Sequence, residues 1–440
     1  MKKLPHVSAL KVLWNSKEIL KNPLPFHKVN FDKLGDTFRI SIPGEGKVLF
    51  SRDPDFVKEV LQKKHRFYAK SKLQTQDLAK YIGYGLLTAE GQHWRTHRRM
   101  IQPAFHLKNL KSLLGIMQEA IAYELNRIVP RKEQDVFELM GDVAFQVVAK
   151  SLFSSNDIRQ PMARLKKVTE ENQRMLIKEM RRPFLKWWFR ASGEIGSELK
   201  KSAEARTILN ALIEERLKGE QNSTDLLDML LAATYEDGSK MPREQLIDEL
   251  LILFTAGHET TANALSFTLY FLAKNENLQE KLLAESLLLD TTSVTLEDLQ
   301  KLPLIQSCIN EAMRLYPPAY FIDRVAMENN EINGFELKKG TLVLLSLFEL
   351  HRHEGFWKAP EDYIADRFLH FQDKTYTDYY YPFGAGPRMC IGNAFATFEM
   401  AMVVATLVKK YKITTSMDRI EINPMISLKP KEVKLQFTLR

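Results

Sequence analysis

The chain has 440 residues, of which 45% are hydrophobic and 27% charged, so it is globular and can bury a large core. Only two cysteines are present, which excludes a disulfide framework and suits a reducing compartment. The net charge is +8, and the sequence contains no recognised nucleic-acid-binding motif. We therefore predict that the basic residues form a solvated surface or a docking face for an acidic protein, and that the protein has no nucleic-acid partner.

The first part of the chain predicts a small β-sheet. Runs of β-forming residues at Thr37–Ile42 and 47–50 flank a turn at 43–46. Asp53 is predicted to cap a helix that has Pro54 at its first position. No apolar run reaches the roughly 20 residues of a membrane span, so we expect no membrane anchor and a cytoplasmic protein.

From residue 91 to residue 314 the pattern predicts helices. The segment 242–274 is expected to form one long helix that is apolar on most faces and therefore crosses the core. Short strands follow the two prolines at 317–318, then an irregular stretch at 356–382, a helix at 393–410 and a β-like tail. The sequence therefore predicts a mainly α protein with a small β-region, built as a single domain over residues 1–440.

The strongest chemical signal is the segment 383–392, which reads Phe-Gly-Ala-Gly-Pro-Arg-Met-Cys-Ile-Gly. Cys390 precedes a predicted helix, whose positive N-terminal end favours a thiolate. The glycines permit tight turns and a close approach of the backbone to a large flat ligand. Arg388 supplies a positive charge for a carboxylate, and Phe383 is placed to shield the sulfur from water. The alternative is a buried structural cysteine after a glycine-rich turn.

A second polar group, Ala-Gly-His-Glu-Thr-Thr at 256–261, lies in the middle of the predicted buried helix. Buried polar groups cost free energy unless they are satisfied, and Gly257 weakens a helix by about 1 kcal/mol relative to alanine. These features predict a locally opened helix in which Thr260 donates to a bound oxygen species and Glu259 relays protons. The alternative is a threonine that bonds to its own helix carbonyl. His258 is expected to point away from the Thr260 face.

Two further pairs have helical spacing. Glu311 and Arg314 share a helical face and are expected to pair, with Arg367 as a third member. Trp94 and Arg98 are spaced so that an indole N–H and a guanidinium can reach the same anion. For this second pair the alternative is a core tryptophan beside a surface arginine.

These motifs, in this order, resemble those of the cytochrome P-450 superfamily. The matching patterns are W-x-x-x-R at 94–98, A-G-x-E-T-T at 256–261, E-x-x-R at 311–314 and F-x-x-G-x-R-x-C-x-G at 383–392. The residues of the central helix motif and around Trp94 are closer to those of long-chain and microsomal-type members than to those of the short bacterial members. The resemblance implies the cytochrome P-450 fold, a triangular helical prism with a long central helix over haem b, and a soluble haem-dependent monooxygenase.

Residue by residue, the resemblance implies that Cys390 is the thiolate ligand of the haem iron. Thr260 and Glu259 would form the acid–alcohol pair that supports oxygen activation, and Ala256 would lie over the haem. A glutamate at this last position esterifies haem in some fatty-acid hydroxylases, so alanine predicts no covalent link. The side chains expected to neutralise the haem propionates are Trp94, Arg98, Arg324 and Arg388.

The resemblance also implies partners. The sequence continues for only 50 residues after Cys390, so we expect no fused reductase, and electrons from a separate ferredoxin or flavodoxin with its NAD(P)H-dependent reductase. Basic side chains expected in the docking face are Arg95, His97, Arg99, Lys108 and Lys111. We expect a monomer. Alternatives with the same fold are a peroxide-driven peroxygenase or isomerase, which generally lacks the acid–alcohol pair, and a non-catalytic haem sensor.

The expected reaction inserts one atom of O2 into a C–H bond of a small organic substrate, by hydroxylation or oxidative O-demethylation. Substrate contacts are expected from residues 70–87, 175–195, 255–256, 319–322 and 425–426. The aromatic residues there favour an apolar substrate such as a fatty acid or terpenoid. Polar side chains at 74–84 keep open a methoxylated compound. The pair Trp187 and Trp188 is expected at the surface.

Overall fold

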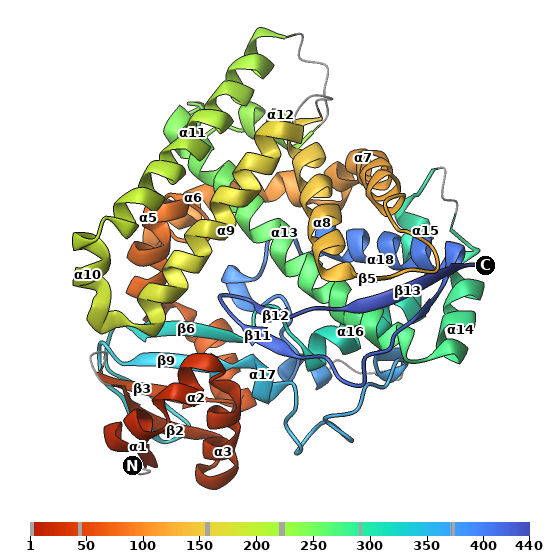
Figure 1. Cartoon of the computed structure of the whole chain (residues 1–440). Helices are drawn as coiled ribbons and strands as arrows, with labels where there is room; N and C mark the ends of the chain where they lie inside the picture. Colours follow the sequence, from red (N-terminus) through yellow and green to blue (C-terminus); the bar gives the residue numbers. More distant parts are fainter. Residues whose placement is uncertain are drawn as a thin grey trace.

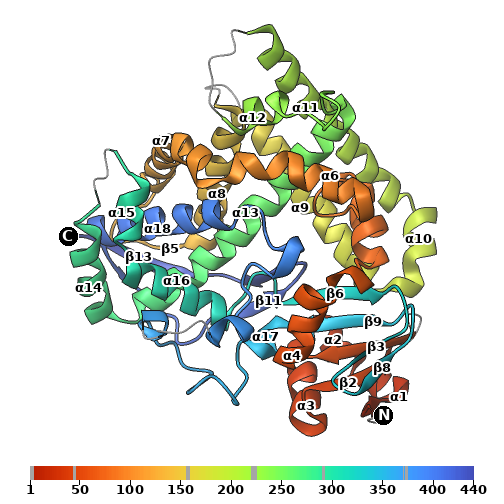
Figure 2. The ribbon, with the colours of Figure 1, turned by 180° about the vertical axis from the view of Figure 1, so that it is seen from behind.

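The computed structural model describes residues 4–42, 46–154, 159–219, 225–289, 293–369, 371 and 375–440. Helices make up most of the molecule, and the main β-sheet occupies one corner of a roughly triangular outline (Figures 1 and 2). The expected mainly α architecture with a small β-region is therefore confirmed. None of the described helices combines the length and apolarity that crossing a membrane requires.

The corner sheet has six strands in the order β1-β2-β3-β9-β6-β4. These are β1 (His6–Val7), β2 (Thr37–Ile42), β3 (Gly46–Ser51), β9 (Leu342–Ser346), β6 (Phe321–Ala326) and β4 (Tyr68–Ala69). Strands β2 and β3 pair antiparallel, as predicted, with Phe38 opposite Phe50; residues 43–45 of the predicted turn lie outside the described residues. Segments 294 residues apart therefore meet in one sheet, since β3 also pairs parallel with β9, with Val48 opposite Leu342.

Short helices surround the sheet: α1 (Ala9–Trp14), α2 (Ser16–Lys21), α3 (Leu24–Leu34) and α4 (Pro54–Lys58). Asp53 caps α4 by accepting a hydrogen bond of 2.7 Å from the N–H of Phe56, and Pro54 takes the first helical position, as predicted.

The middle of the chain is helical. Its helices are α5 (Ala79–Ile82), α6 (Gly91–Ile101), α7 (Leu107–Leu125), α8 (Val136–Phe153), α9 (Arg159–Arg181), α10 (Lys186–Ala191), α11 (Glu194–Lys218) and α12 (Leu226–Ala232). One short strand, β5 (Glu133–Asp135), interrupts this predicted all-helical region because it pairs with a strand near the C-terminus. Local sequence does not show such long-range pairing.

Helix α13 (Arg243–Ala273) spans 31 residues and runs through the centre of the molecule, as predicted (Figure 1, green). It packs against α8, α16 (Pro303–Leu315) and α18 (Asn393–Lys410). Most of its side chains are buried, which agrees with its apolar composition.

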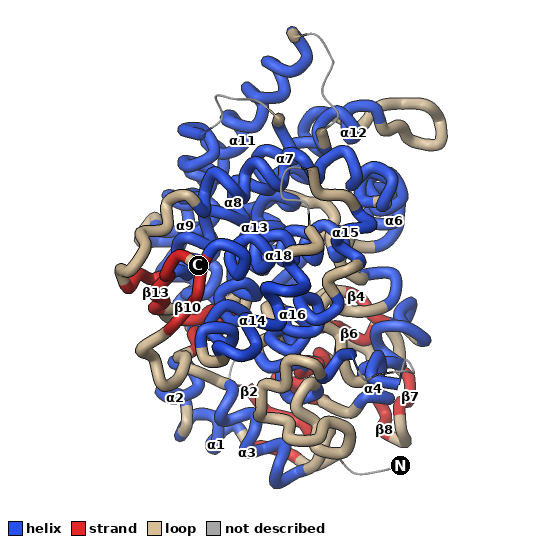
Figure 3. Tube along the Cα trace, turned by 90° about the vertical axis from the view of Figure 1, so that its right-hand side faces the viewer, coloured by secondary structure: helices blue, strands red, loops and turns tan. Residues whose placement is uncertain are grey.

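The remaining elements follow α13. They are α14 (Glu276–Ser286), α15 (Leu296–Gln300), β7 (Asn330–Ile332), β8 (Phe335–Leu337), α17 (Leu347–Leu350), β10 (Tyr411–Thr414), β11 (Ile422–Pro424), β12 (Leu428–Pro430) and β13 (Lys434–Leu439). The β11–β12 hairpin packs against α13, and β13 lies between β10 and β5. Figure 3 shows the helices as a thick layer, with most strands grouped at its lower side and β10 and β13 at its edge.

Candidate active site

The cysteine loop, residues 383–392, connects the irregular stretch to α18. Cys390 donates its backbone N–H to the carbonyl oxygen of Phe383 at 2.9 Å, which closes the loop. Gly384 and Gly386 have φ angles of +71° and +68°, a region that side chains other than glycine rarely adopt. A Cβ added to Gly386 would collide with the backbone carbonyl of Leu61. The loop therefore packs directly on the π-helical turn η1 (Glu59–Lys63).

Cys390 is exposed, whereas Cys308 is buried in the core. Protein still surrounds Cys390, and this desolvation raises the pKa of its thiol, while the N–H of Gly392 and the charge of Arg98 lower that pKa. Helix α18 begins at Asn393, three residues after Cys390.

A second part of the candidate site lies on α13. Ala256 is exposed although its neighbours Phe254, Thr255 and His258 are buried, and Thr260 one turn further on is half-exposed. An exposed alanine in the middle of a buried helix indicates an internal space beside that helix face, because no outer surface is available there.

The helix beside this space is continuous, and the prediction of a locally opened helix is wrong. Thr260 Oγ1 donates to the carbonyl oxygen of Ala256 at 3.0 Å, which satisfies the hydroxyl within the helix. Close packing explains the glycine at position 257 instead, because a Cβ there would lie 3.1 Å from a methyl group of Val148 on α8. His258 is buried with Nδ1 2.8 Å from the carbonyl oxygen of Phe254, away from Thr260 as expected.

Glu259 is bonded to the β11–β12 hairpin, a contact that the sequence reasoning missed. Its carboxylate accepts a hydrogen bond from Ser427 Oγ and pairs with Lys429 Nζ at 2.9 Å. Ser427 Oγ in turn accepts from Asn263 Nδ2 at 2.9 Å. A local signal existed: Glu259 and Asn263 are polar residues one turn apart on a buried helix, a spacing that indicates a shared polar partner.

The cations expected to bind propionates converge in part. The Arg388 guanidinium lies 3.8 Å above the ring of Trp94 and pairs with Glu90 at 2.6 Å. Burial lowers the pKa of Arg388 to about 10 and also lowers the pKa of the Arg324 guanidinium. Arg98 donates to the carbonyl of Met389 at 2.9 Å, beside the cysteine. Two carboxylates, Glu90 and Asp323, act on these cations, which outnumber them, so the arrangement can hold a further anion.

Lys70 joins these cations and was missed by sequence reasoning. Its ammonium donates to the carbonyl oxygens of Leu86 and Leu87, at 3.1 and 2.6 Å. Burial lowers its pKa to about 7, and the nearby charges of Arg388 and Arg324 act in the same direction. An isolated lysine after a short strand gives no local signal, so this residue could be found only from the fold.

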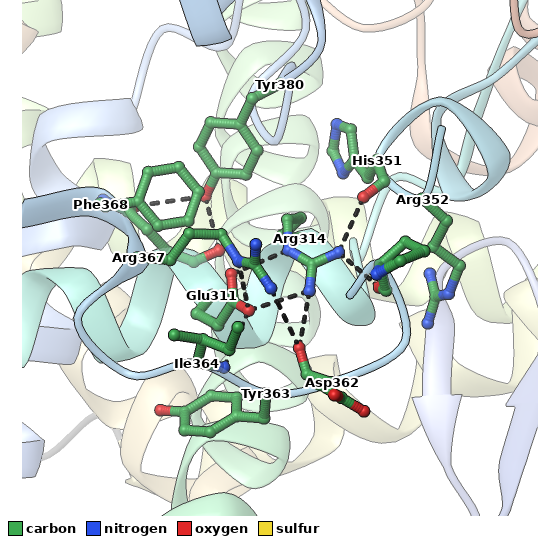
Figure 4. Close-up of polar contacts among 12 residues, drawn as sticks. Glu311, Arg314, His351, Arg352, Asp362, Tyr363, Ile364, Arg367, Phe368 and Tyr380 are labelled. Carbon is green, nitrogen blue, oxygen red and sulfur yellow. Dashed lines mark hydrogen bonds and ion pairs between the residues drawn. The ribbon is translucent and has the colours of Figure 1, made fainter. Parts of the chain in front are cut away.

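Glu311, Arg314 and Arg367 form the expected ion-pair network (Figure 4). Glu311 and Arg314 are fully buried and share two contacts of 2.8 and 2.9 Å, while Arg367 Nε reaches Glu311 at 2.9 Å. Arg314 also donates to the carbonyl oxygens of His351, Pro360 and Asp362. The network therefore fixes the irregular stretch that leads into the cysteine loop.

The expected docking residues are exposed with one exception. Arg95, Arg99, Lys108 and Lys111 are exposed, whereas His97 is buried with its ring nitrogen 3.0 Å from the hydroxyl of Tyr235. The prediction for His97 is wrong because this position faces inward on the amphipathic helix α6.

The polar side chains of the 74–84 region are largely occupied by the protein itself. Gln74 donates to Asp323, and Lys80 and Tyr81 both bond to the buried carboxylate of Glu179. Trp187 and Trp188 are 65% and 51% exposed, as expected for a surface pair.

Comparison with known proteins places the chain in a family. The family model for Cytochrome P450 matches residues 5–437. The chain is 30% identical over 394 residues to a cytochrome P450 132 sequence of Mycobacterium bovis, and the alignment covers 86% of this chain and 85% of the relative. It is 31% identical over 405 residues to cytochrome P450 4A12 of Rattus norvegicus, covering 86% and 78%.

The fold agrees with a solved structure. The heme domain of cytochrome P450DA superposes with a TM-score of 0.84 at 22% identity, covering 100% of this chain and 98% of that chain. The chain belongs to the cytochrome P450 family. It is a haem protein and a haem-dependent monooxygenase, and the exposed thiol of Cys390 with its neighbouring cations fits such a group.

Proposed function

We propose that the chain inserts one oxygen atom from O2 into a C–H bond of an apolar organic substrate, with Cys390 as the iron ligand. The observation that carries this proposal is the position of Cys390, the one described cysteine that is exposed, in a loop that Gly386 holds against η1. Haem bound through this sulfur would supply the oxygen chemistry.

The protein would hold the haem carboxylates with the side chains that converge near the loop. These are Trp94, Arg98, Arg324 and Arg388, to which the fold adds Lys70. Burial lowers the pKa values of Lys70, Arg324 and Arg388, and a bound carboxylate would offset this desolvation, which supports the proposal. Phe383, whose carbonyl accepts from Cys390, would limit the access of water to the sulfur.

On the other side, Ala256 would lie against the haem because it is exposed in the otherwise mostly buried middle of α13. Thr260 would turn its hydroxyl from the carbonyl of Ala256 toward the space beside Ala256, where it could donate a hydrogen bond. Glu259 would deliver protons after leaving its hairpin partners.

The substitution Cys390→Ala tests the ligand assignment. The purified variant should lose the strongly red-shifted band of the reduced CO complex, because that band depends on a thiolate ligand. Cys308→Ala is the matched control and should keep the band, since this cysteine is buried in the core. Survival of the band in Cys390→Ala would refute the assignment.

Electrons would come from a separate ferredoxin or flavodoxin. The exposed side chains of Arg95, Arg99, Lys108 and Lys111 support an acidic partner. Charge reversal at Arg95 and Arg99 should weaken partner binding at low salt and lose this effect at high salt. Unchanged affinity of the double variant for ferredoxin and flavodoxin would argue against this face.

The substrate class can be read from a spectral titration of the ferric protein, since displacement of a water on iron shifts the Soret band. One panel holds fatty acids and terpenoids, and the other holds methoxylated aromatics and sugars. We expect the shift with the apolar panel, because Gln74, Lys80 and Tyr81 are already bonded to protein groups. A shift with the methoxylated panel alone would favour oxidative demethylation instead.

A further inference from the structure

A pocket separate from the candidate active site lies between α7 and α18. These two helices pack together on the side of the molecule away from the corner sheet (Figure 1). The pocket has a volume of about 390 Å³ and lies along the C-terminal half of α18. Lys409 of its lining is roughly 24 Å along the helix axis from Asn393, where α18 begins after the cysteine loop. The pocket is therefore distinct from the region proposed to hold haem.

The floor of this pocket is apolar and comes from three parts of the chain. Helices α7 and α18 contribute two large aliphatic side chains each, and the segment after α14 closes the third side. Small-molecule pockets are mostly apolar and have volumes of about 300–1,000 Å³, so this pocket has room for one small molecule with an apolar body. The aliphatic side chains of the floor are Ile121, Leu125, Leu289, Val294, Met402 and Leu407.

Two consecutive lysines form the polar side of the pocket. Lys409 Nζ donates to the carbonyl oxygen of Leu289 at 3.0 Å, and Lys410 Nζ donates to Asn126 Oδ1 at 3.3 Å. Lys410 Nζ also lies 5.4 Å from the ring centre of Tyr411. Among the residues that the structure describes, the partners of both ammonium groups are therefore neutral. An anion bound here would gain hydrogen bonds from two charged donors, which are stronger than those between neutral groups.

We propose that this pocket binds an amphipathic carboxylate, an apolar chain that ends in one carboxylate group. The chain would lie on the aliphatic floor, and each carboxylate oxygen would accept a hydrogen bond from one of the two ammonium groups, Lys409 and Lys410. The bound molecule would contact α7 and α18 together and would stabilise the folded protein, because the pocket exists only in that state. This second site does not depend on which compound reacts at the haem.

The test uses the haem-loaded full chain, with carbon monoxide on the reduced iron and methionine methyl groups labelled with carbon-13. Met402 lines the pocket, so its methyl resonance, assigned with Met402→Leu, should shift when dodecanoate is added below its micelle concentration. Dodecanol and dodecyltrimethylammonium are the matched probes, with the same chain and a neutral or positive head. We expect dodecanoate to bind about tenfold more tightly than either, since only its head can accept hydrogen bonds as an anion.

A double variant tests the role of the two lysines. Lys409→Gln with Lys410→Gln should weaken dodecanoate binding at Met402 about tenfold and leave dodecanol binding unchanged. The matched control is Lys412→Gln with Lys431→Gln, which removes the same charge outside the pocket, where these lysines pair with exposed glutamates at 3.1 and 2.6 Å. This control should bind dodecanoate as the wild type does, so a loss caused by net charge alone would be recognised.

A third variant separates this pocket from the haem site. Ala122→Trp places an indole in the pocket, so the shift of the Met402 methyl resonance should disappear, while the Soret response of the ferric protein to dodecanoate stays as in the wild type. A Met402 shift that persists in Ala122→Trp, wild-type affinity in the double variant, or equal binding of the three probes would overturn the proposal. If the double variant does not fold, as its methionine spectrum will show, the comparison of the three probes on the wild type decides.

Discussion

The substitution Gly386→Ala tests how the cysteine loop is held, and Gly384→Ala is its matched control. Both glycines have φ near +70°, so each alanine should cost about 1–2 kcal/mol of backbone strain. The two positions differ in the space available for a Cβ atom. A Cβ at Gly384 meets only a side-chain methyl of Ile322 at 3.6 Å, whereas at Gly386 it collides with the backbone carbonyl of Leu61.

The collision at Gly386 can be relieved only by moving the loop away from η1, because a backbone carbonyl cannot rotate aside as a side chain can. Overpacking of this kind costs about 1–3 kcal/mol, so we expect Gly386→Ala to lose about 2–5 kcal/mol in total. The assay is guanidinium unfolding of both variants, together with the fraction of haem that gives the thiolate-type CO band. Equal losses in the two variants would refute the argument from close packing.

Three further predictions concern buried groups. Glu311→Gln should lower the unfolding free energy by about 3–5 kcal/mol in urea, because the charge of Arg314 loses its buried partner; a loss below 1 kcal/mol would contradict this. Burial raises the pKa of Glu249 from 4.5 to about 7, so the folded state binds its proton more tightly than the unfolded state and stability falls as pH rises through that window. In Glu249→Gln the pH-dependent fall in the unfolding free energy should be smaller by about 3 kcal/mol. Parallel curves of unfolding free energy against pH for the wild type and the variant, between pH 4.5 and 7.5, would contradict this prediction. Burial raises the pKa of the Cys308 thiol to about 12, so a thiol reagent should label Cys390 alone in folded haem-free protein and both cysteines after unfolding; fast labelling of Cys308 in the folded protein would disagree.

Local patterns predicted the elements well where the signal lies within one segment. The apolar run at 242–274 predicted α13 to within a residue at each end, and the helix at 393–410 matches α18. Asp53 followed by Pro54 predicted the start of α4. Each of these depends on periodicity or capping, which neighbouring residues determine among themselves.

Contacts between distant segments could not be predicted. Lys70 joins the cation group only because β4 pairs with β6, which brings it near Arg324. Lys429 meets Glu259 only because the hairpin packs on α13. Their positions show why a motif search finds Glu259 and not its partner Lys429.

Strand β13 lies between β10 and β5. Strand β5, which follows α7, has no neighbour in this sheet until residues 434–436 have been synthesised, 299 residues later when counted from Asp135 to its partner Lys434. Its edge would stay open on the ribosome while α7 and α8 can already pack together. We expect the docking of β13 to be a late step of folding, and removal of residues 434–440 to leave a species that is prone to aggregation.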